Sequence, residues 1–255
     1  MHWVQPHIPF TPATTSLSGK TIIVTGANTG LGFEAARQLL QLGTFTLILA
    51  VRDVAKGLRA RTALLSDPRI PCTPTILVYE LNLSSHTSVI AFVRKVNANI
   101  PVLDVLLLNG AVNTTSWTVS PSTQNELIFQ VNFLSNALLS ILLLPLLRSS
   151  AKITGSPSRL TFVGSQGQEY HVLDDIPIPT NTSLLAHLNN PLVCSIWRRY
   201  SDCKLLLTMW VYMLAAHLDP SEVTANILCP GLVYTGIYAN LPLWLYMIMS
   251  LVVTL

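Results

Sequence analysis

The chain alternates between short apolar runs and longer stretches in which apolar residues recur every three or four positions. Short β-branched runs bounded by turn residues predict buried strands, and the longer period predicts amphipathic helices between them. This alternation favours a parallel sheet covered on both faces. We therefore expect one α/β domain, a Rossmann-like doubly wound sheet of about six strands. The expected strands are residues 21–24, 46–50, 75–79, 102–108, 160–163 and 224–228.

The intervening helices carry recognisable start signals. Asp53 is expected near the N-cap of one helix, and Ser84 or Ser85 at the cap of the next. A long apolar helix is expected to end near Pro145, because proline interrupts helices. The expected helices are residues 33–42, 53–65, 86–98, 123–147 and 200–218. Residues 166–199 are rich in Pro, Asn and Thr before the last helix, and predict a long loop that is an insertion or an active-site cover.

Composition supports a single domain. Half of the 255 residues are hydrophobic and 11% are charged, so the chain can build one sizeable core. Residues 1–18 are interpreted as an N-terminal extension and residues 19–255 as the domain. The extension lacks the apolar region of a signal peptide, and no run reaches about 18 uninterrupted apolar residues, so an ordinary membrane span is not predicted.

Charge and cysteine usage exclude some functions. The net charge of +3 is small and the basic residues do not cluster, which argues against nucleic-acid binding. The four cysteines form no C-x-x-C pair and no metal-ligand spacing, so we expect free thiols, no metal site and a reducing, cytoplasmic location. They are Cys72, Cys194, Cys203 and Cys229.

A glycine-rich turn follows the first expected strand. Its spacing is Gly26-x-x-x-Gly30-x-Gly32, and the next helix begins directly after it. Glycines between a strand and a helix let the backbone approach a pyrophosphate, which then lies at the helix N-terminus. The pattern alone is weak, since a plain turn would have the same glycines, but its position favours a nucleotide site.

A second motif, Tyr200-x-x-x-Lys204, lies at the start of the last expected helix. This spacing puts the phenol and the ammonium on one helical face. A nearby ammonium favours the phenolate form, which suits a general acid or base. Alone, the pair is equally consistent with a tyrosine packed beside a surface lysine.

Together, in this order, the two motifs make the chain resemble the short-chain dehydrogenase/reductase family from about Gly19 to Thr235. Other family marks fall in register: Asn109 after the fourth strand, Asn132 in the long helix and Ser165 after the fifth strand. The sequence Pro230-Gly231-x-Val233-x-Thr235 is similar to the turn that contacts the nicotinamide end of the cofactor. The proline-rich N-terminal segment and the residues around these motifs most resemble fungal members of the family that act in secondary metabolism.

The resemblance implies a role for each matched residue. Tyr200 would exchange a proton with a carbonyl or alcohol oxygen, Lys204 would bind the nicotinamide ribose and favour the phenolate, and Ser165 would hydrogen-bond the reacting oxygen. Asn132 would help hold a water for proton relay. The implied cofactor-binding residues are Thr25, Gly26, Asn28, Thr29, Gly30, Leu31, Gly32, Arg52, Lys56, Asn82, Leu83, Asn109, Gly110, Tyr200, Lys204, Pro230, Gly231, Val233 and Thr235.

The end of the second strand bears on the choice of cofactor. An acid there would bind the ribose 2′-hydroxyl of NAD, but this chain has Val51 followed by Arg52. The Arg52 guanidinium can grip a 2′-phosphate, and Lys56 adds a second positive charge. We therefore expect NADP(H), with a solvated loop arginine as the alternative.

The chain departs from the family pattern at several positions. Asn82-Leu83 replaces the usual Asp-Leu, and we expect the Asn82 amide oxygen still to accept from adenine. Gly110-Ala111 reverses the usual order, and Gly164 replaces a serine. Ser165 and Tyr200 are 35 positions apart, longer than the usual family spacing.

The C-terminal region differs most from the family. The chain ends at Leu255 where the family continues through a substrate lid, so we expect the seventh strand to be missing and the sixth to be an edge. Residues 237–255 form an apolar segment without a charged side chain. Residues 241–255 are expected to pack as part of a lid or against a second copy in a homo-oligomer, rather than in a membrane interface.

Two functions stay open. The first is an NADP(H)-dependent oxidoreductase that interconverts a ketone and a secondary alcohol, with a small and apolar carbonyl or alcohol substrate. The second is a weak or inactive relative that keeps the fold as a cofactor-binding or interaction scaffold. Presence of all four catalytic positions favours the enzyme, and the shortened C-terminus favours the scaffold.

Overall fold

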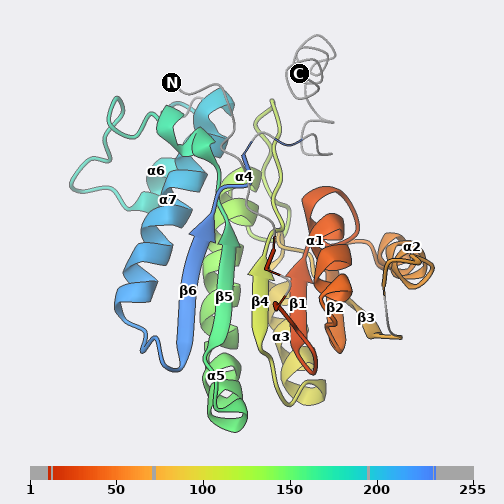
Figure 1. The fold of residues 1–255 in the computed structure, drawn as a ribbon. Coiled ribbons are helices and arrows are strands. Elements are labelled where there is room, and N and C mark those ends of the chain that lie inside the picture. Colours follow the sequence, from red (N-terminus) through yellow and green to blue (C-terminus); the bar gives the residue numbers. More distant parts are fainter. Residues whose placement is uncertain (1–10, 13, 71–72, 194–195, 232, 234–255) are drawn as a thin grey trace.

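A six-stranded parallel sheet forms the centre of the molecule (Figure 1). The computed structural model describes residues 11–12, 14–70, 73–193, 196–231 and 233. In this part of the chain the strand order is β3-β2-β1-β4-β5-β6, so the expected doubly wound sheet is confirmed. The order reverses between β1 and β4, where ligands bind in such sheets. The strands are β1 (Thr21–Thr25), β2 (Thr46–Val51), β3 (Thr75–Glu80), β4 (Val105–Leu108), β5 (Ser158–Val163) and β6 (Val223–Leu228).

Helices cover both faces of the sheet. Neighbouring residues of β1 point to opposite faces: Ile22 packs in one core with α1 and α2, and Ile23 in another with α3, α5 and α7. All strands are parallel, so their carboxyl ends meet at one edge, where the candidate site lies. The helical elements are α1 (Gly30–Gln41), α2 (Val54–Leu65), α3 (His86–Asn99), α4 (Leu127–Phe129), the π-helix η1 (Gln130–Leu134), α5 (Ser135–Thr154), the 3₁₀-helix η2 (Gln166–Tyr170), α6 (Leu184–Leu188) and α7 (Ile196–Ala216).

Two helix starts agree with the sequence-based caps. The Asp53 carboxylate accepts a hydrogen bond from the Lys56 backbone N–H at 3.0 Å and caps α2. The Ser85 hydroxyl accepts from the Ser88 N–H at 3.3 Å and caps α3. Each cap satisfies a backbone donor that the helix itself leaves unpaired.

The expectation that the long helix ends near Pro145 was wrong. The run begins at Leu127, passes through a π segment and continues beyond Pro145 to Thr154. Pro145 removes one backbone donor, but Leu143 and Leu147 on either side of it are fully buried, and their packing keeps the helix intact. The helix ends at Gly155, whose φ of 66° is the left-handed conformation of a C-terminal cap.

This same run, Leu127–Thr154, is long and apolar enough to cross a membrane by length and composition alone. In the fold, however, 56% of its most apolar window is buried inside the protein. The run lies against the sheet with Leu139, Leu143 and Leu147 in the main core. It is therefore accounted for as the central core helix of this domain.

The expected long loop contains regular structure, which corrects that prediction. Residues 166–193 include η2 and α6, and α7 begins at Ile196 rather than at Tyr200. Leu184 and Leu188 of α6 pack against other residues near the carboxyl edge, and Leu188 is almost fully buried. A helix of this length depends on such packing rather than on local sequence, so composition alone predicted a loop.

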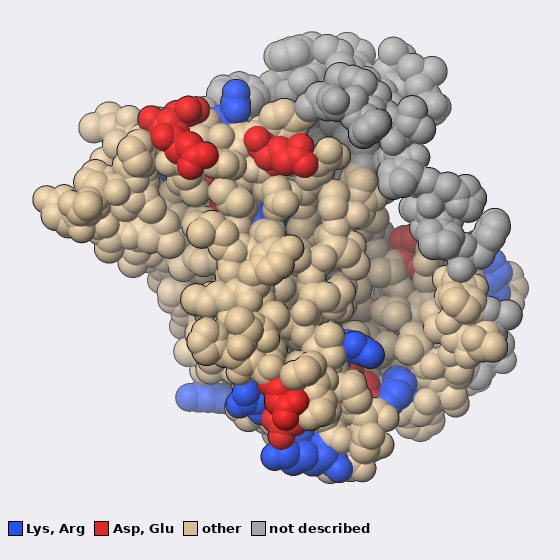
Figure 2. All heavy atoms as spheres, turned by 60° about the vertical axis from the view of Figure 1, so that its left-hand side comes forward, with Lys and Arg blue, Asp and Glu red and all other residues tan. Residues whose placement is uncertain are grey.

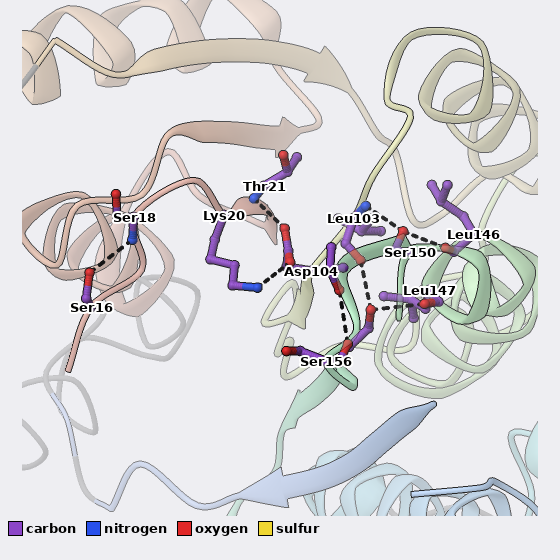
Figure 3. Close-up of polar contacts among 12 residues, drawn as sticks. Ser16, Ser18, Lys20, Thr21, Leu103, Asp104, Leu146, Leu147, Ser150 and Ser156 are labelled. Carbon is purple, nitrogen blue, oxygen red and sulfur yellow. Dashed lines mark hydrogen bonds and ion pairs between the residues drawn. The ribbon is translucent and has the colours of Figure 1, made fainter. Parts of the chain in front are cut away.

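At the opposite edge, a buried carboxylate joins β1 to β4 (Figure 3). Asp104 accepts hydrogen bonds from the Lys20 ammonium at 2.8 Å and from the Thr21 N–H at 2.9 Å. Nearby, the Ser150 hydroxyl of α5 accepts from the Leu103 N–H at 2.8 Å. These bonds fix the start of the central strands and leave the carboxyl edge available for a ligand.

The face around α6 and α7 carries few charged side chains across its middle (Figure 2). On α7, Met209, Tyr212 and Met213 are 57%, 72% and 51% exposed. Their spacing places the three side chains on one side of the helix. This face is thus more apolar than an ordinary solvated helix surface.

Candidate cofactor and active site

The glycine turn joins β1 to α1 with very close backbone packing. Gly26 and Gly30 have φ values of 66° and 55°, in the left-handed region that favours glycine. A Cβ on Gly32 would lie 2.4 Å from the Gly26 carbonyl oxygen, so only glycine allows α1 to start this close to β1. Thr29 precedes the helix without a side-chain cap, and the first turn has no acidic residue. The first backbone N–H groups of α1 therefore suit an anion.

Other residues predicted in this turn surround the same helix start. Asn28 and Leu31 are partly buried, and Thr29 and Gly30 are exposed. The four residues lie between the end of β1 and the first turn of α1, at the carboxyl edge of the sheet. This arrangement fits the pyrophosphate of a dinucleotide.

Thr25 connects the carboxyl ends of β1 and β4 through hydrogen bonds to the residues that follow β4. Its hydroxyl accepts hydrogen bonds from the backbone N–H groups of Asn109 at 2.9 Å and Gly110 at 2.8 Å. The Asn109 side-chain amide donates to the Thr25 carbonyl at 2.9 Å. A Cβ on Gly110 would lie 2.8 Å from a Leu83 methyl carbon, which gives a physical reason for glycine at this position.

Ser84 already binds the Asn82 side-chain oxygen that was expected to accept a hydrogen bond from adenine. The Asn82 Oδ1 accepts two hydrogen bonds from Ser84, at 3.1 Å from its N–H and 2.7 Å from its hydroxyl. Two such bonds occupy the usual acceptor capacity of an amide oxygen. An adenine amino group would have to displace Ser84 to bind as expected.

Arg52 and Lys56 both lie at the carboxyl end of β2. Arg52 directly follows the strand, Lys56 is in the first turn of α2, and both side chains are exposed. The neighbouring Asp53 carboxylate caps α2, and the Lys56 N–H hydrogen bond holds the pKa of that carboxyl below its usual range. Two cations thus stand where the 2′-substituent of an adenosine ribose is expected.

The loop after β6 lies partly outside the described residues. Pro230 and Gly231 follow β6 at the same edge, Gly231 has a φ of 74°, and Val233 is partly buried. Thr235 and the segment 237–255 lie outside the described residues. The part that is described keeps the predicted Pro-Gly turn beside the end of β5.

Three of the four predicted catalytic residues gather at the end of β5. Ser165 follows the strand, and its Oγ accepts from the Gly167 N–H at 3.1 Å. A Cβ on Gly167 would lie 3.1 Å from that Oγ and 3.8 Å from the Tyr200 ring, so the serine and the tyrosine flank Gly167. The Lys204 Nζ lies 5.6 Å from the centre of the Tyr200 ring.

Lys204 is a buried cation with one strong hydrogen bond. It is 3% exposed, and its Nζ donates to the Val163 carbonyl oxygen at 2.6 Å. Burial lowers the pKa of Lys204 to about 8. The ammonium is thus charged at neutral pH but close to its titration range.

Asn132 lies in the π-helix η1, and its side chain is fully buried. Its Oδ1 accepts from the Val112 N–H and its Nδ2 donates to the Val112 carbonyl, both at 2.8 Å. The side chain therefore orients the segment after β4, and the expected water relay would have to use the backbone of η1. Single π turns within helices are frequent at functional sites.

An open hollow of about 470 Å³ adjoins the serine. Ser165, Thr208 and Tyr212 line it, together with Cys229, Pro230 and Gly231. Among the described lining residues there is neither Tyr200 nor Lys204. The hollow is consequently a neighbour of the predicted catalytic group rather than a cavity around it.

Three buried charges near Tyr200 were missed by the sequence reasoning. Glu126 is fully buried, Arg199 is 1% exposed and Asp202 is 2% exposed. Burial raises the pKa of Glu126 and of Asp202. A signal was available, because Glu126 is the only acidic residue between Asp104 and Glu169 and directly precedes an apolar helix.

The sheet order, the glycine turn and the Tyr200–Lys204 pair define a nucleotide-binding doubly wound α/β protein with a candidate acid/base site at its carboxyl edge. Residues 20–172, more than half of the chain, match the family model described as short chain dehydrogenase. The chain therefore belongs to the short-chain dehydrogenase/reductase family of oxidoreductases.

Relatives from fungi share sequence along almost the whole chain. The short chain dehydrogenase macD of Penicillium terrestre is 40% identical over 253 residues, which are 98% of this chain and 76% of that protein. The short chain dehydrogenase sor7 of Hypocrea jecorina is 43% identical over 251 residues, 97% of this chain and 70% of that protein.

A solved structure agrees with the fold. The Pseudomonas aeruginosa RhlG/NADP active-site complex superposes with a TM-score of 0.67 at 23% identity, covering 89% of this chain and 77% of that chain. At this level of identity the likeness supports the architecture alone. The family resemblance expected from the sequence motifs is thus confirmed by the family model and the fungal relatives, and the expected fold by the solved structure.

Proposed function

We propose that this protein interconverts a ketone and a secondary alcohol by hydride transfer, with NADP(H) as its cofactor. The observation that carries the proposal is the grouping of Ser165, Tyr200 and Lys204 at the end of β5, on the same sheet edge as the glycine turn. A bound nicotinamide would supply or accept the hydride. In the reducing direction the Tyr200 hydroxyl gives its proton to the carbonyl oxygen, so hydride and proton together make the alcohol.

The neighbouring residues assist this proton transfer. The Ser165 hydroxyl donates a hydrogen bond to the reacting oxygen and holds it near the phenol. The charged Lys204 ammonium favours the phenolate that is left after transfer. The first backbone N–H groups of α1 would hold the pyrophosphate end of the cofactor, because Gly32 lets this helix start very close to β1.

Arg52 supports NADP(H) over NAD(H). It is exposed at the carboxyl end of β2, where no carboxylate other than the capping Asp53 follows the strand. A guanidinium can form paired hydrogen bonds with a 2′-phosphate, whereas NAD(H) has only a hydroxyl to offer. The proposed substrate is a small, apolar carbonyl or alcohol compound.

The alternative is a cofactor-binding scaffold with little turnover. Two observations favour it. The Lys204 ammonium donates a 2.6 Å hydrogen bond to the Val163 carbonyl, and the Asn132 side chain makes two hydrogen bonds with the Val112 backbone. Both side chains are groups that catalysis would use. Both functions require the same cofactor. They differ in turnover.

The deciding experiment is a titration of the purified protein with NADPH and NADH, followed by nicotinamide fluorescence and thermal shift. NADPH-selective binding, followed by NADPH oxidation with members of a panel of apolar and aromatic ketones, would support the enzyme. Selective binding without turnover on the panel would support the scaffold. Absence of binding in folded protein would contradict the proposed cofactor.

We further propose a place in a fungal secondary-metabolite pathway, since the relatives macD and sor7 come from fungi. We propose the cytoplasm as its location, because the four cysteines show no C-x-x-C pair and no metal-ligand spacing. Deletion of the gene should remove an alcohol product and accumulate its ketone, as measured by mass spectrometry of extracts. An unchanged profile under conditions of expression would oppose this placement. A homo-oligomer is also proposed, and light scattering of the purified protein tests it, since a monomer mass would contradict it.

A further inference from the structure

The segment that contains η2 and α6 is tied by partly buried hydrogen bonds to the residues just before α4 and η1, the helical run that carries Asn132. We name residues 166–193 the insertion. At the end of α6 in this insertion, the Asn189 Oδ1 accepts from the Glu126 backbone N–H and its Nδ2 donates to the Asn125 Oδ1, both at 2.8 Å. One side chain of the insertion thereby holds two successive residues in front of α4.

The hydrogen bonds continue from Asn125 along the π segment. The Asn125 amide donates to the Gln130 Oε1 at 2.7 Å, and the Gln130 amide donates to the Ser135 hydroxyl at 2.8 Å. The Ser135 hydroxyl in turn donates to the Leu83 carbonyl in the loop after β3. These groups are buried and follow η1 from one end to the other, past Asn132. A fully paired polar chain of this kind specifies one arrangement of the backbone.

A buried ion pair joins the same place to the helix that carries Tyr200. The Glu126 carboxylate accepts from the Ile128 and Phe129 N–H groups at 2.9 and 2.8 Å and so caps α4. The Arg199 Nε lies 3.8 Å from the Glu126 Oε2, and both side chains are almost wholly buried. Arg199 directly precedes Tyr200 in α7.

The geometry of this ion pair indicates that it positions the two helices and contributes little to stability. The Arg199 Nε and Nη2 have no hydrogen-bond partner among the described residues. Removing two charges from water costs several kcal/mol each, and a 3.8 Å contact without hydrogen bonds returns little of that cost. A pair kept at such a cost is explained better by the position it gives to its helices.

An apolar cluster completes the connection. Leu188 of α6 packs with Ile128 and Phe129 of α4 and with Cys203 of α7, and Tyr200 lies against this cluster. The cluster is separate from the two cores that cover the sheet. The insertion, α4–η1 and the start of α7 therefore form one small packed unit around the candidate acid/base.

We propose that the insertion is a positioning element, which sets Tyr200 relative to Asn132 through Asn189 and the Glu126–Arg199 pair. The inference rests on the proposed reaction at Tyr200 and deepens it. Glu126, Asn189 and Arg199 are positioning residues in this account, acting through the helices that carry the reacting groups. Misplacement of a catalytic group by about 1 Å can lower the rate about a hundredfold.

The first test separates position from stability with a double variant. Glu126→Gln removes the carboxylate of the Arg199 ion pair and should lower the melting temperature. Glu126→Gln combined with Arg199→Met removes both charges of the pair and should restore most of the loss, because the buried Asp202 keeps its hydrogen bond from the Val172 N–H. With a ketone that the wild type reduces, kcat of the double variant should stay about ten- to a hundredfold low. Its Kd for NADPH should stay within about twofold, since the glycine turn is untouched. Recovery of kcat together with the melting temperature would overturn the proposal.

The second test needs neither turnover nor the double variant. Asn189→Ala removes both bonds to residues 125 and 126, and Asn190→Ala changes the neighbouring amide, whose side chain bonds only locally with Leu192 in the described chain. Hydrogen–deuterium exchange of residues 127–134 should rise about tenfold in Asn189→Ala and stay unchanged in Asn190→Ala. Unchanged exchange in Asn189→Ala would overturn the link. A wild type that reduces no ketone would refute the proposed function, and the exchange measurement would still decide this inference.

Discussion

The Lys204 ammonium donates a hydrogen bond to the carbonyl oxygen of Val163, 2.6 Å away, from a site that is 3% exposed. This hydrogen bond to β5 places the cation 5.6 Å from the centre of the Tyr200 ring. Because burial opposes the charged form, the pKa of Lys204 falls to about 8. The buried charge is therefore a cost to stability at neutral pH.

The pH dependence of stability follows from that pKa. Between pH 8 and about 10.4 the unfolded chain holds the Lys204 proton and the folded chain has lost it, so stability rises with pH in this window. Below pH 8 both states are protonated and the destabilisation, roughly 3 kcal/mol, is present in full. Lys204→Met should remove this rise. Urea unfolding of both proteins from pH 7 to 10.5 checks it, and parallel curves would contradict the lowered pKa.

Tyr200→Phe should lower kcat by about a hundredfold or more, because the variant lacks the proton that the carbonyl oxygen receives. NADPH affinity should change little, since the ring and its contacts are kept. Tyr79→Phe is the matched control, because it removes a phenol from β3 at the other side of the sheet. Stopped-flow NADPH oxidation measures the rate, and full activity in Tyr200→Phe would refute the assigned acid/base.

Arg52→Ala should weaken NADPH binding by about ten- to a hundredfold and NADH binding by much less. The reason is that a charge-assisted contact to phosphate contributes about 1.5–3 kcal/mol, and NADH has no 2′-phosphate. Arg94→Ala on α3 removes the same charge from an exposed site elsewhere and should leave both affinities unchanged. Fluorescence titrations give the four affinities. An equal loss for NADPH and NADH would remove Arg52 from the 2′-phosphate site.

Gly32→Ala should abolish measurable NADPH binding, because its Cβ would lie 2.4 Å from a backbone oxygen and force α1 away from β1. Gly155→Ala is the control: Gly155 ends α5 with a φ of 66°, a conformation that side chains rarely adopt, so this variant also strains the fold. Both variants should melt at lower temperature than the wild type. If Gly32→Ala bound NADPH as well as Gly155→Ala does, the close approach of α1 would not form the phosphate site.

Much of the fold could be read from local sequence. The six strands, the caps at Asp53 and Ser85 and the glycine turn all depend on neighbouring residues, such as alternation within β1 or a side chain that bonds three positions on. The family motifs could be found in the same way, since Tyr200 and Lys204 share one helical face through their spacing alone. Local geometry is thus what the sequence by itself determined.

The tertiary structure decided what depends on distant residues. The long helix continues through Pro145 because Leu143 and Leu147 are buried against the sheet, and α6 forms because Leu188 packs on α4 and α7. Three hydrogen-bonded pairs near the site join residues 20 to 63 positions apart: Lys204 with Val163, Asn132 with Val112, and Asn189 with Glu126. No local pattern contains such contacts, because burial and pairing arise only when the chain has brought these elements together.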